Sequence, residues 1–125
     1  MLAYATLGTH DLARAAAFYD ELLAIIGGKR MMGDDNFIAW TGPANGAGLG
    51  ITYPFNGEPA TVGNGVMVAL ECSSREQVDA MHAKALALGG TDEGAPGQRM
   101  EWFYAAYFRD LDGNKLNACY ISQGG

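Results

Sequence analysis

Histidine and cysteine, which bind metals and carry acid–base or nucleophilic chemistry, are scarce in this 125-residue sequence, with two of each. The only histidines are His10 and His82. His10 falls in a strand-to-helix connection, where a capping or solvent-exposed role is favoured over metal ligation. His82 falls on the apolar stripe of a helix, where a half-buried, hydrogen-bonded histidine is favoured. Neither is expected to reach a binding cavity.

Three other side chains are candidates for chemistry or binding, and each has a structural alternative. Glu71 is a weak candidate for a general base, and an exposed carboxylate at a strand end is favoured. Cys119 is a weak nucleophile candidate because no histidine is placed to activate it, so a small buried apolar role is favoured. Cys72 lies on the opposite sheet face by strand alternation, which argues against a disulfide between the two. Arg99, just before a strand, either holds a substrate anion or stays solvated.

Length and composition place these residues in one globular domain. Hydrophobic residues make up 49% of the chain and charged residues 18%, with a net charge of −6. An acidic chain without a basic run disfavours nucleic acids and anionic membranes as partners. No apolar stretch approaches the roughly 18 residues of a membrane span, and no signal peptide is recognised. Two cysteines without a framework fit a reducing compartment, so a cytoplasmic location is expected.

The elements that must position these residues repeat along the chain. In the first half, residues 2–8 read as a strand and residues 12–26 as an amphipathic helix. In the second, residues 66–70 read as a strand and Ser73-Ser74 begins a helix that Gly89-Gly90 ends. Three further strands follow each helix, expected at residues 28–32, 37–41 and 48–53, then near Thr91 and at residues 102–109 and 115–121.

This order predicts two tandem βαβββ modules in a single domain: module one (residues 1–53), a linker (54–64) and module two (65–122). The predicted fold class is α+β, with the modules forming a curved mixed sheet and the helices on its outer face. The last hairpin of each module carries an Asx-Gly turn, Asn45-Gly46 and Asp112-Gly113.

Strand alternation predicts which side chains reach the inner face of that sheet, the cup. The expected set is Tyr4, Thr6, Gly50, Thr52, Met67, Glu71, Asn117 and Cys119. Such a cup is mostly apolar with a few hydrogen-bonding groups, the general form of a small-molecule site. Tyr4 and Asn117 either orient a ligand or satisfy each other. Tyr104, with Trp102 or Phe103, either stacks on a ligand or belongs to the core, because apolar residues occupy both phases of that strand.

Two segments, THDLARAAAFYDELLA (9–24) and FYAAYFRDLDGNKLNACY (103–120), resemble the vicinal oxygen chelate superfamily of glyoxalases, extradiol dioxygenases and bleomycin resistance proteins. The most specific part is the D-x-D-G-N turn, Asp110 to Asn114, with Leu111 where the family usually has proline. The resemblance covers nearly the whole chain. Within the superfamily, the chain is most similar in these motifs to small bacterial glyoxalase-like proteins. The resemblance also implies a homodimer.

The resemblance also implies a divalent metal held by His and Glu side chains from four strands. The matching positions here carry Tyr4, Gly50, Met67 and Asn117. Glycine has no ligand atom, a thioether is too soft for a hard divalent ion, and the amide is uncharged. A lone phenolate does not hold a metal, so no metal and no cofactor are predicted.

Two classes of function follow. The first is a small-molecule binding protein that uses Tyr4, Thr6, Gly50, Thr52, Met67, Asn117, Arg99 and Tyr104. The alternative is an enzyme of the glyoxalase kind: a lyase, isomerase or dioxygenase-like relative. It would be metal-dependent with non-standard ligands, or metal-free with Glu71 or Tyr4 as the catalytic candidate. Since fold does not imply function, the resemblance alone does not decide between the two classes.

Overall fold

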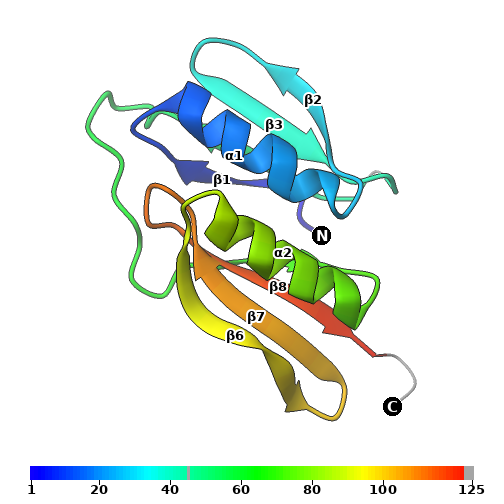
Figure 1. The fold of residues 1–125 in the computed structure, drawn as a ribbon. Coiled ribbons are helices and arrows are strands. Elements are labelled where there is room, and N and C mark those ends of the chain that lie inside the picture. The colour runs from blue at the N-terminus through cyan, green and yellow to red at the C-terminus, as the bar shows by residue number, and fades with distance from the viewer. Residues whose placement is uncertain (45, 123–125) are drawn as a thin grey trace.

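The structure is a computed structural model that describes residues 1–44 and 46–122 (Figure 1). The elements of module one are β1 (Tyr4–Gly8), α1 (Leu12–Ala24), β2 (Lys29–Gly33), β3 (Phe37–Thr41) and β4 (Gly48–Thr52). Those of module two are β5 (Val68–Glu71), α2 (Arg75–Ala87), β6 (Thr91–Met100), β7 (Phe103–Arg109) and β8 (Lys115–Ile121). The predicted α+β class and the βαβββ order of both modules are confirmed.

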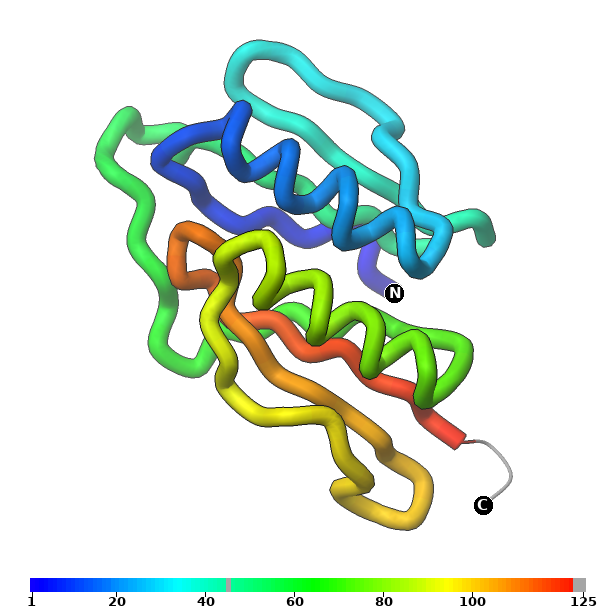
Figure 2. Tube along the Cα trace, viewed as in Figure 1, coloured from blue at the N-terminus to red at the C-terminus, as the bar shows by residue number. Residues whose placement is uncertain are grey.

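Each module forms its own four-stranded sheet, with strand orders β1-β4-β3-β2 and β5-β8-β7-β6. In both, the first strand pairs in parallel with the last, and the other pairs are antiparallel. The two helices lie side by side on one side of the sheets, and the trace of each module repeats the other (Figure 2). The face of each sheet away from its helix is called its open face below.

Local sequence explains where the helices begin and end. The Asp11 side chain accepts a hydrogen bond from the Arg14 backbone N–H at the start of α1, and the Ser74 hydroxyl accepts one from Gln77 N–H at the start of α2. Both helices end before a glycine with positive φ, Gly27 at 78° and Gly89 at 101°. The predicted helix boundaries are therefore confirmed to within about one turn.

The core fills the space between each helix and its sheet. Alternate strand residues point into it, and the largest side chains with under 2% exposure include Trp40, Tyr19, Phe108, Leu22 and Ile51. The predicted phases of β1, β4, β5 and β8 are confirmed, because Leu7, Leu49, Leu70 and Leu116 are buried beneath the helices. The open faces thus carry the residues assigned to the cup from those strands.

A side-chain contact between an acidic and a basic residue fixes the edge strand of each module to its helix. On α1, Asp20 accepts two hydrogen bonds from Arg30 of β2, at 2.9 and 2.7 Å, and one from the Trp40 indole. The Arg30 guanidinium lowers the pKa of the Asp20 carboxyl. On α2, His82 Nε2 lies 2.9 Å from Asp92 Oδ1 of β6, and this contact lowers the pKa of Asp92. The hydrogen-bonded role predicted for His82 is confirmed, with the ring buried rather than half-buried.

The structure departs from the sequence-based expectation at two elements. The weak run near Thr91 is the ten-residue strand β6, which pairs with β7 through three register shifts. Because this strand is held by backbone pairing with β7, it does not need alternating apolar side chains, and its sequence signal is therefore weak. The strand expected at 66–70 begins at Val68, and Val66 is exposed. Gly113 adopts positive φ in the second predicted Asx-Gly turn, and Asn45 of the first lies outside the described residues.

No helix in the part of the chain that the structure describes is long and apolar enough to cross a membrane.

Candidate functional site

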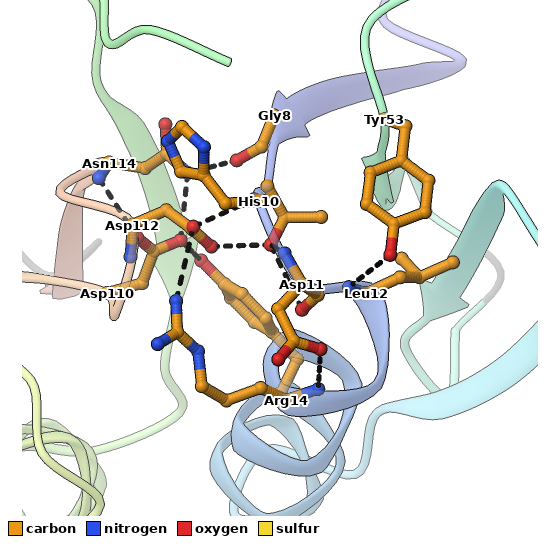
Figure 3. Close-up of polar contacts among 11 residues, drawn as sticks. Gly8, His10, Asp11, Leu12, Arg14, Tyr53, Asp110, Asp112 and Asn114 are labelled. Carbon is orange, nitrogen blue, oxygen red and sulfur yellow. Dashed lines mark hydrogen bonds and ion pairs between the residues drawn. The ribbon is translucent and has the colours of Figure 1, made fainter. Parts of the chain in front are cut away.

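The densest polar cluster joins the two modules at the D-x-D-G-N turn and is called the clasp below (Figure 3). Buried Asp110 accepts hydrogen bonds on Oδ2 from the Tyr19 hydroxyl at 2.5 Å and from the Asn114 amide at 3.0 Å. Its Oδ1 accepts the backbone N–H groups of Asp112 and Asn114, both at 2.9 Å. The Asn114 amide also donates to the Gly8 carbonyl at the end of β1.

The second carboxylate of the clasp, Asp112, reaches back to the start of α1. Its Oδ2 accepts a hydrogen bond from the Thr9 hydroxyl at 2.6 Å, and its Oδ1 accepts the His10 backbone N–H at 3.0 Å. The Arg14 guanidinium lies 3.5 Å from the same oxygen. His10 takes part through its backbone, consistent with the non-ligand role expected for it. Because donors of the fold occupy all four carboxylate oxygens, the clasp serves structure rather than chemistry.

A mostly apolar cavity lies on the open face of module one. This basin has a volume of about 430 Å³, and its lining is mostly apolar. It is lined by Ala3, Tyr4, Met31, Met32, Phe37, Ala39, Thr41, Gly46 and Gly48. Its volume falls within the roughly 300–1,000 Å³ typical of small-molecule sites. Of the predicted site residues, Tyr4 alone lines it.

The Phe37 ring closes one side of the basin by lying over Gly50. A Cβ at Gly50 would meet the ring at 2.6 Å and the Thr6 methyl at 3.3 Å. Phe37 also packs edge-on against Tyr4, with 6.4 Å between ring centroids. Glycine at position 50 therefore gives Phe37 its place against the sheet, rather than leaving space for a ligand there.

Thr6 and Thr52 open onto a different cavity, between the ends of β1 and β4 and the linker. It has a volume of about 1030 Å³ and is lined by Gly8, Asn36, Tyr53 and residues 54–61 in addition to the two threonines. The Thr52 hydroxyl donates to backbone carbonyls, Asn36 O at 3.1 Å and Tyr53 O at 2.8 Å. The Thr52 hydroxyl therefore serves the strand end. Neither this cavity nor the basin includes a residue of module two.

The remaining predicted inner residues lie on module two. Asn117 is 1% exposed, and its amide donates to the carbonyls of Ala106 at 3.0 Å and Ala118 at 3.4 Å. Its polar atoms are thus satisfied by backbone rather than by Tyr4, which is 61% exposed in the other module. Met67 is exposed before β5, and Glu71 is exposed at its end. Arg99 lies near the end of β6.

Tyr104 lies on the helix side of β7. Its hydroxyl donates to Asp79 Oδ1 of α2 at 2.6 Å, and the Arg75 guanidinium stands over its ring. The hydrogen bond to Asp79 raises the pKa of the phenol. The phase that the sequence left open is therefore settled: Tyr104, Ala106 and Phe108 face α2, and Tyr107 belongs to the open face.

The two cysteines are buried, free thiols. Burial raises the pKa of the Cys72 thiol to about 12, and burial also raises the pKa of Cys119. The Cys72 backbone N–H donates to the Cys119 carbonyl at 2.7 Å, which places both residues across one strand pair. Since the thiolate is the reactive form, neither residue has the environment of a nucleophile.

The four positions that match the family's metal ligands do not fit a metal. Phe37 covers Gly50, backbone carbonyls hold the Asn117 amide, and Tyr4 lies in a different sheet from Met67 and Asn117. None of the four supplies the imidazole or carboxylate that a divalent ion of this chemistry requires. Among residues 1–44 and 46–122, no three His, Cys, Asp or Glu side chains are grouped as ligands.

Sequence reasoning missed the basin because it placed both modules around one cup. The modules instead join through the clasp and by contacts of α1 with α2, where Gln77 donates to the Ile25 carbonyl and Lys84 lies 3.5 Å from Glu21. Alternation in β3 does contain the missing signal. With Ile38 and Trp40 in the core, Phe37, Ala39 and Thr41 must share the open face.

Comparison with known proteins places this geometry among relatives. A family model described as the Glyoxalase/Bleomycin resistance protein/Dioxygenase superfamily matches residues 1–118. A crystal structure of a glyoxalase/bleomycin resistance protein from Albidiferax ferrireducens T118 is 40% identical, covers 96% of this chain and 98% of its own, and superposes with a TM-score of 0.88. A search of curated proteins finds no match.

Two more distant structures share the fold. A glyoxalase-related enzyme from Fulvimarina pelagi is 22% identical over 96% of this chain and 87% of its own, with a TM-score of 0.77. A lactoylglutathione lyase from Agrobacterium tumefaciens is 19% identical over 96% of this chain and 92% of its own, with a TM-score of 0.69. At these identities the likeness shows the fold alone.

Proposed function

The chain belongs to the glyoxalase/bleomycin resistance protein/dioxygenase superfamily, and from that premise we propose that it binds a small, largely apolar molecule in the basin of module one. The observation that carries this proposal is the basin itself: about 430 Å³, with Met31, Met32 and Phe37 supplying apolar surface. Tyr4, an exposed side chain, and Thr41 supply the two side-chain hydroxyls among its lining residues. An apolar pocket with few polar groups favours a largely apolar ligand with few hydrogen-bonding functions.

The methionines suit such a pocket. Unbranched thioether side chains adapt to ligands of different shape and make favourable contacts with aromatic rings. Met31 and Met32 are each 56% exposed on the edge strand β2, so a ligand would bury apolar surface that now faces water. The proposal needs no metal, in keeping with the poor fit of Tyr4 and Gly50 to metal binding.

Binding of the neutral fluorophore N-phenyl-1-naphthylamine tests the proposal. Wild-type protein should bind it saturably, and Tyr4→Ala and Met32→Glu should each weaken binding by about tenfold, equivalent to about 1.4 kcal/mol. Met100→Glu is the matched control, since Met100 is an equally exposed methionine on the edge strand of module two. Equal binding by Met32→Glu and wild type would overturn the proposal, with circular dichroism confirming that each variant is folded.

The alternative proposal is a lyase or isomerase of the glyoxalase kind, supported by family membership. Here Glu71, exposed at the end of β5, would be the base, or Tyr4 the acid. Turnover of a hemithioacetal that Glu71→Gln abolishes would favour this alternative over simple binding. Turnover lost on chelator dialysis would instead require a metal site that these residues do not form.

The homodimer expected from the family resemblance and the cytoplasmic location stay predictions. A second copy covering the open faces would shield exposed apolar residues on both modules, such as Tyr4, Met32 and Met67. Sedimentation equilibrium between micromolar and millimolar chain concentrations measures the oligomeric state directly.

A further inference from the structure

The open face of module two carries two cations gathered on one aromatic ring. Tyr107 lies on β7, between β6 and β8. The Arg99 guanidinium of β6 and the Lys115 ammonium of β8 each lie 5.6 Å from the centroid of its ring. The ring thus holds a charged group from each neighbouring strand by cation–π contact, and these two residues are called the cation pair below.

The Arg99 side chain is held along its own strand. Its Nη2 donates to the Ala95 carbonyl at 2.7 Å, so the guanidinium folds back over β6. A Cβ at Gly97 would lie 2.7 Å from Nη1, so a side chain at that position would displace the guanidinium. With one donor bound to Ala95 and its face on Tyr107, the guanidinium is partly ordered before a ligand binds, which lowers the side-chain entropy cost of binding.

The cation pair has no counter-ion in the part of the chain that the structure describes. Arg14, Arg30, Lys84 and Arg109 have carboxylate partners within 4 Å there, whereas Lys29, Arg75, Arg99 and Lys115 have none. Among these four, Arg99 and Lys115 are the two that contact one aromatic ring. Glu93, on the same strand as Arg99, lies 3.2 Å from Arg109. Two cations without carboxylate partners against one ring make a local positive field that an anion would relieve.

We propose that Arg99 and Lys115 form a binding site for a small oxyanion, the carboxylate or phosphate group of an acidic metabolite-sized molecule. The planar guanidinium offers paired donors that match an oxyanion, and Lys115 adds a point charge against the same ring. Tyr107 orients both cations. The site lies on the other module from the basin, so it stands or falls independently of the proposed apolar ligand.

Titrations followed by ¹H–¹⁵N NMR at constant ionic strength test this site, with sodium benzoate and inorganic phosphate as probes and neutral benzamide as control. Saturable shifts of the Arg99 Nε–H and of amides in 94–99 are expected with at least one anion and not with benzamide. The anion that binds more tightly shows whether the natural group is a carboxylate or a phosphate.

Variants separate a built site from general charge attraction. Arg99→Gln should weaken binding by about tenfold, and Lys115→Gln by about threefold. Gly97→Ala retains the charge but displaces the guanidinium, so it should weaken binding severalfold, whereas Gly42→Ala, where a Cβ meets nothing within 4 Å, should not. Lys29→Gln controls for net charge. Non-saturable shifts with both anions, or equal affinity of Arg99→Gln and wild type, would overturn the proposal.

Discussion

Module one and module two fix an edge strand to a helix at equivalent positions, with the acidic and basic residues exchanged. In module one the acid, Asp20, is on the helix and the base, Arg30, is ten residues later on the strand. In module two the base, His82, is on the helix and the acid, Asp92, follows after the same interval. The repeat has kept the contact and exchanged its chemistry, so geometry rather than residue type is what the scaffold requires there.

The open faces differ more. That of module one presents methionines and Phe37 around an apolar basin, and that of module two presents Arg99 and Lys115 around Tyr107. The helix-covered faces remain similar, because each must fill a core of the same shape. Binding chemistry in this fold is therefore free to diverge on the face that packing does not constrain.

The largest effect should come from breaking the joint that holds the two modules together. Asp110→Ala removes the acceptor of the Tyr19 hydroxyl, the Asn114 amide and two backbone N–H groups. Buried donors left without partners should lower the free energy of unfolding by about 3–5 kcal/mol. Urea denaturation measures this change.

Arg14→Gln, at a half-exposed ion pair of the same clasp, is the control and should cost less than about 1 kcal/mol. A loss below 1 kcal/mol in Asp110→Ala would show that the modules do not depend on the clasp.

A smaller change tests the module-one side of this joint. Burial first, and then the Asp110 charge, raises the pKa of the Tyr19 phenol well above its usual value. Because the folded pKa exceeds the unfolded value of about 10, this contribution to stability is complete below pH 10 and is lost as pH rises above it. Tyr19→Phe should cost about 1–2 kcal/mol at pH 7. It should also flatten the alkaline fall in stability, and a variant with the wild-type alkaline profile would assign that fall to other groups.

The module-one ion pair gives a pH signature at the acid end. The pKa of Asp20 is lowered in the folded state, so its stabilising contribution is present above the unfolded pKa and is lost as pH falls through the folded value. Asp20→Asn keeps an acceptor for the Trp40 indole but removes the charge. With solvent screening of a half-exposed pair, it should cost about 0.5–1 kcal/mol at pH 7 and less near pH 2. Urea unfolding at both pH values measures the difference, and a cost that does not change with pH would argue against the ion pair.

The smallest expected effect concerns the two thiols, both of which lie in module two. With the pKa of Cys72 raised to about 12 and that of Cys119 also raised, native protein should react negligibly with iodoacetamide at pH 7.5. Mass spectrometry should show both sites labelled only after denaturation. Rapid labelling of Cys119 in native protein would reopen it as a nucleophile.

Local pattern predicted much of this molecule and failed where contacts are distant in sequence. The bounds of β3 and β8, the caps at Asp11 and Ser74, and the phase of β1 follow from neighbouring residues. The separation of the predicted cup into two open faces does not follow from neighbouring residues, because it depends on how the modules join. The contact of the Phe37 ring with Gly50 could not be predicted either, because it forms between two strands and the sequence of one strand does not specify its partner.

The span of the clasp has a consequence for how the chain folds. Its Thr9–Asp112 and Asn114–Gly8 hydrogen bonds join residues 103 and 106 positions apart. Closing so long a loop costs entropy that local pairing does not, so these bonds should form after each module has collapsed. Disrupting them should then accelerate unfolding far more than it slows folding. During synthesis, the hydrogen bonds between module one and the clasp turn can form only after residues 110–114 have emerged, when nearly the whole chain has been made.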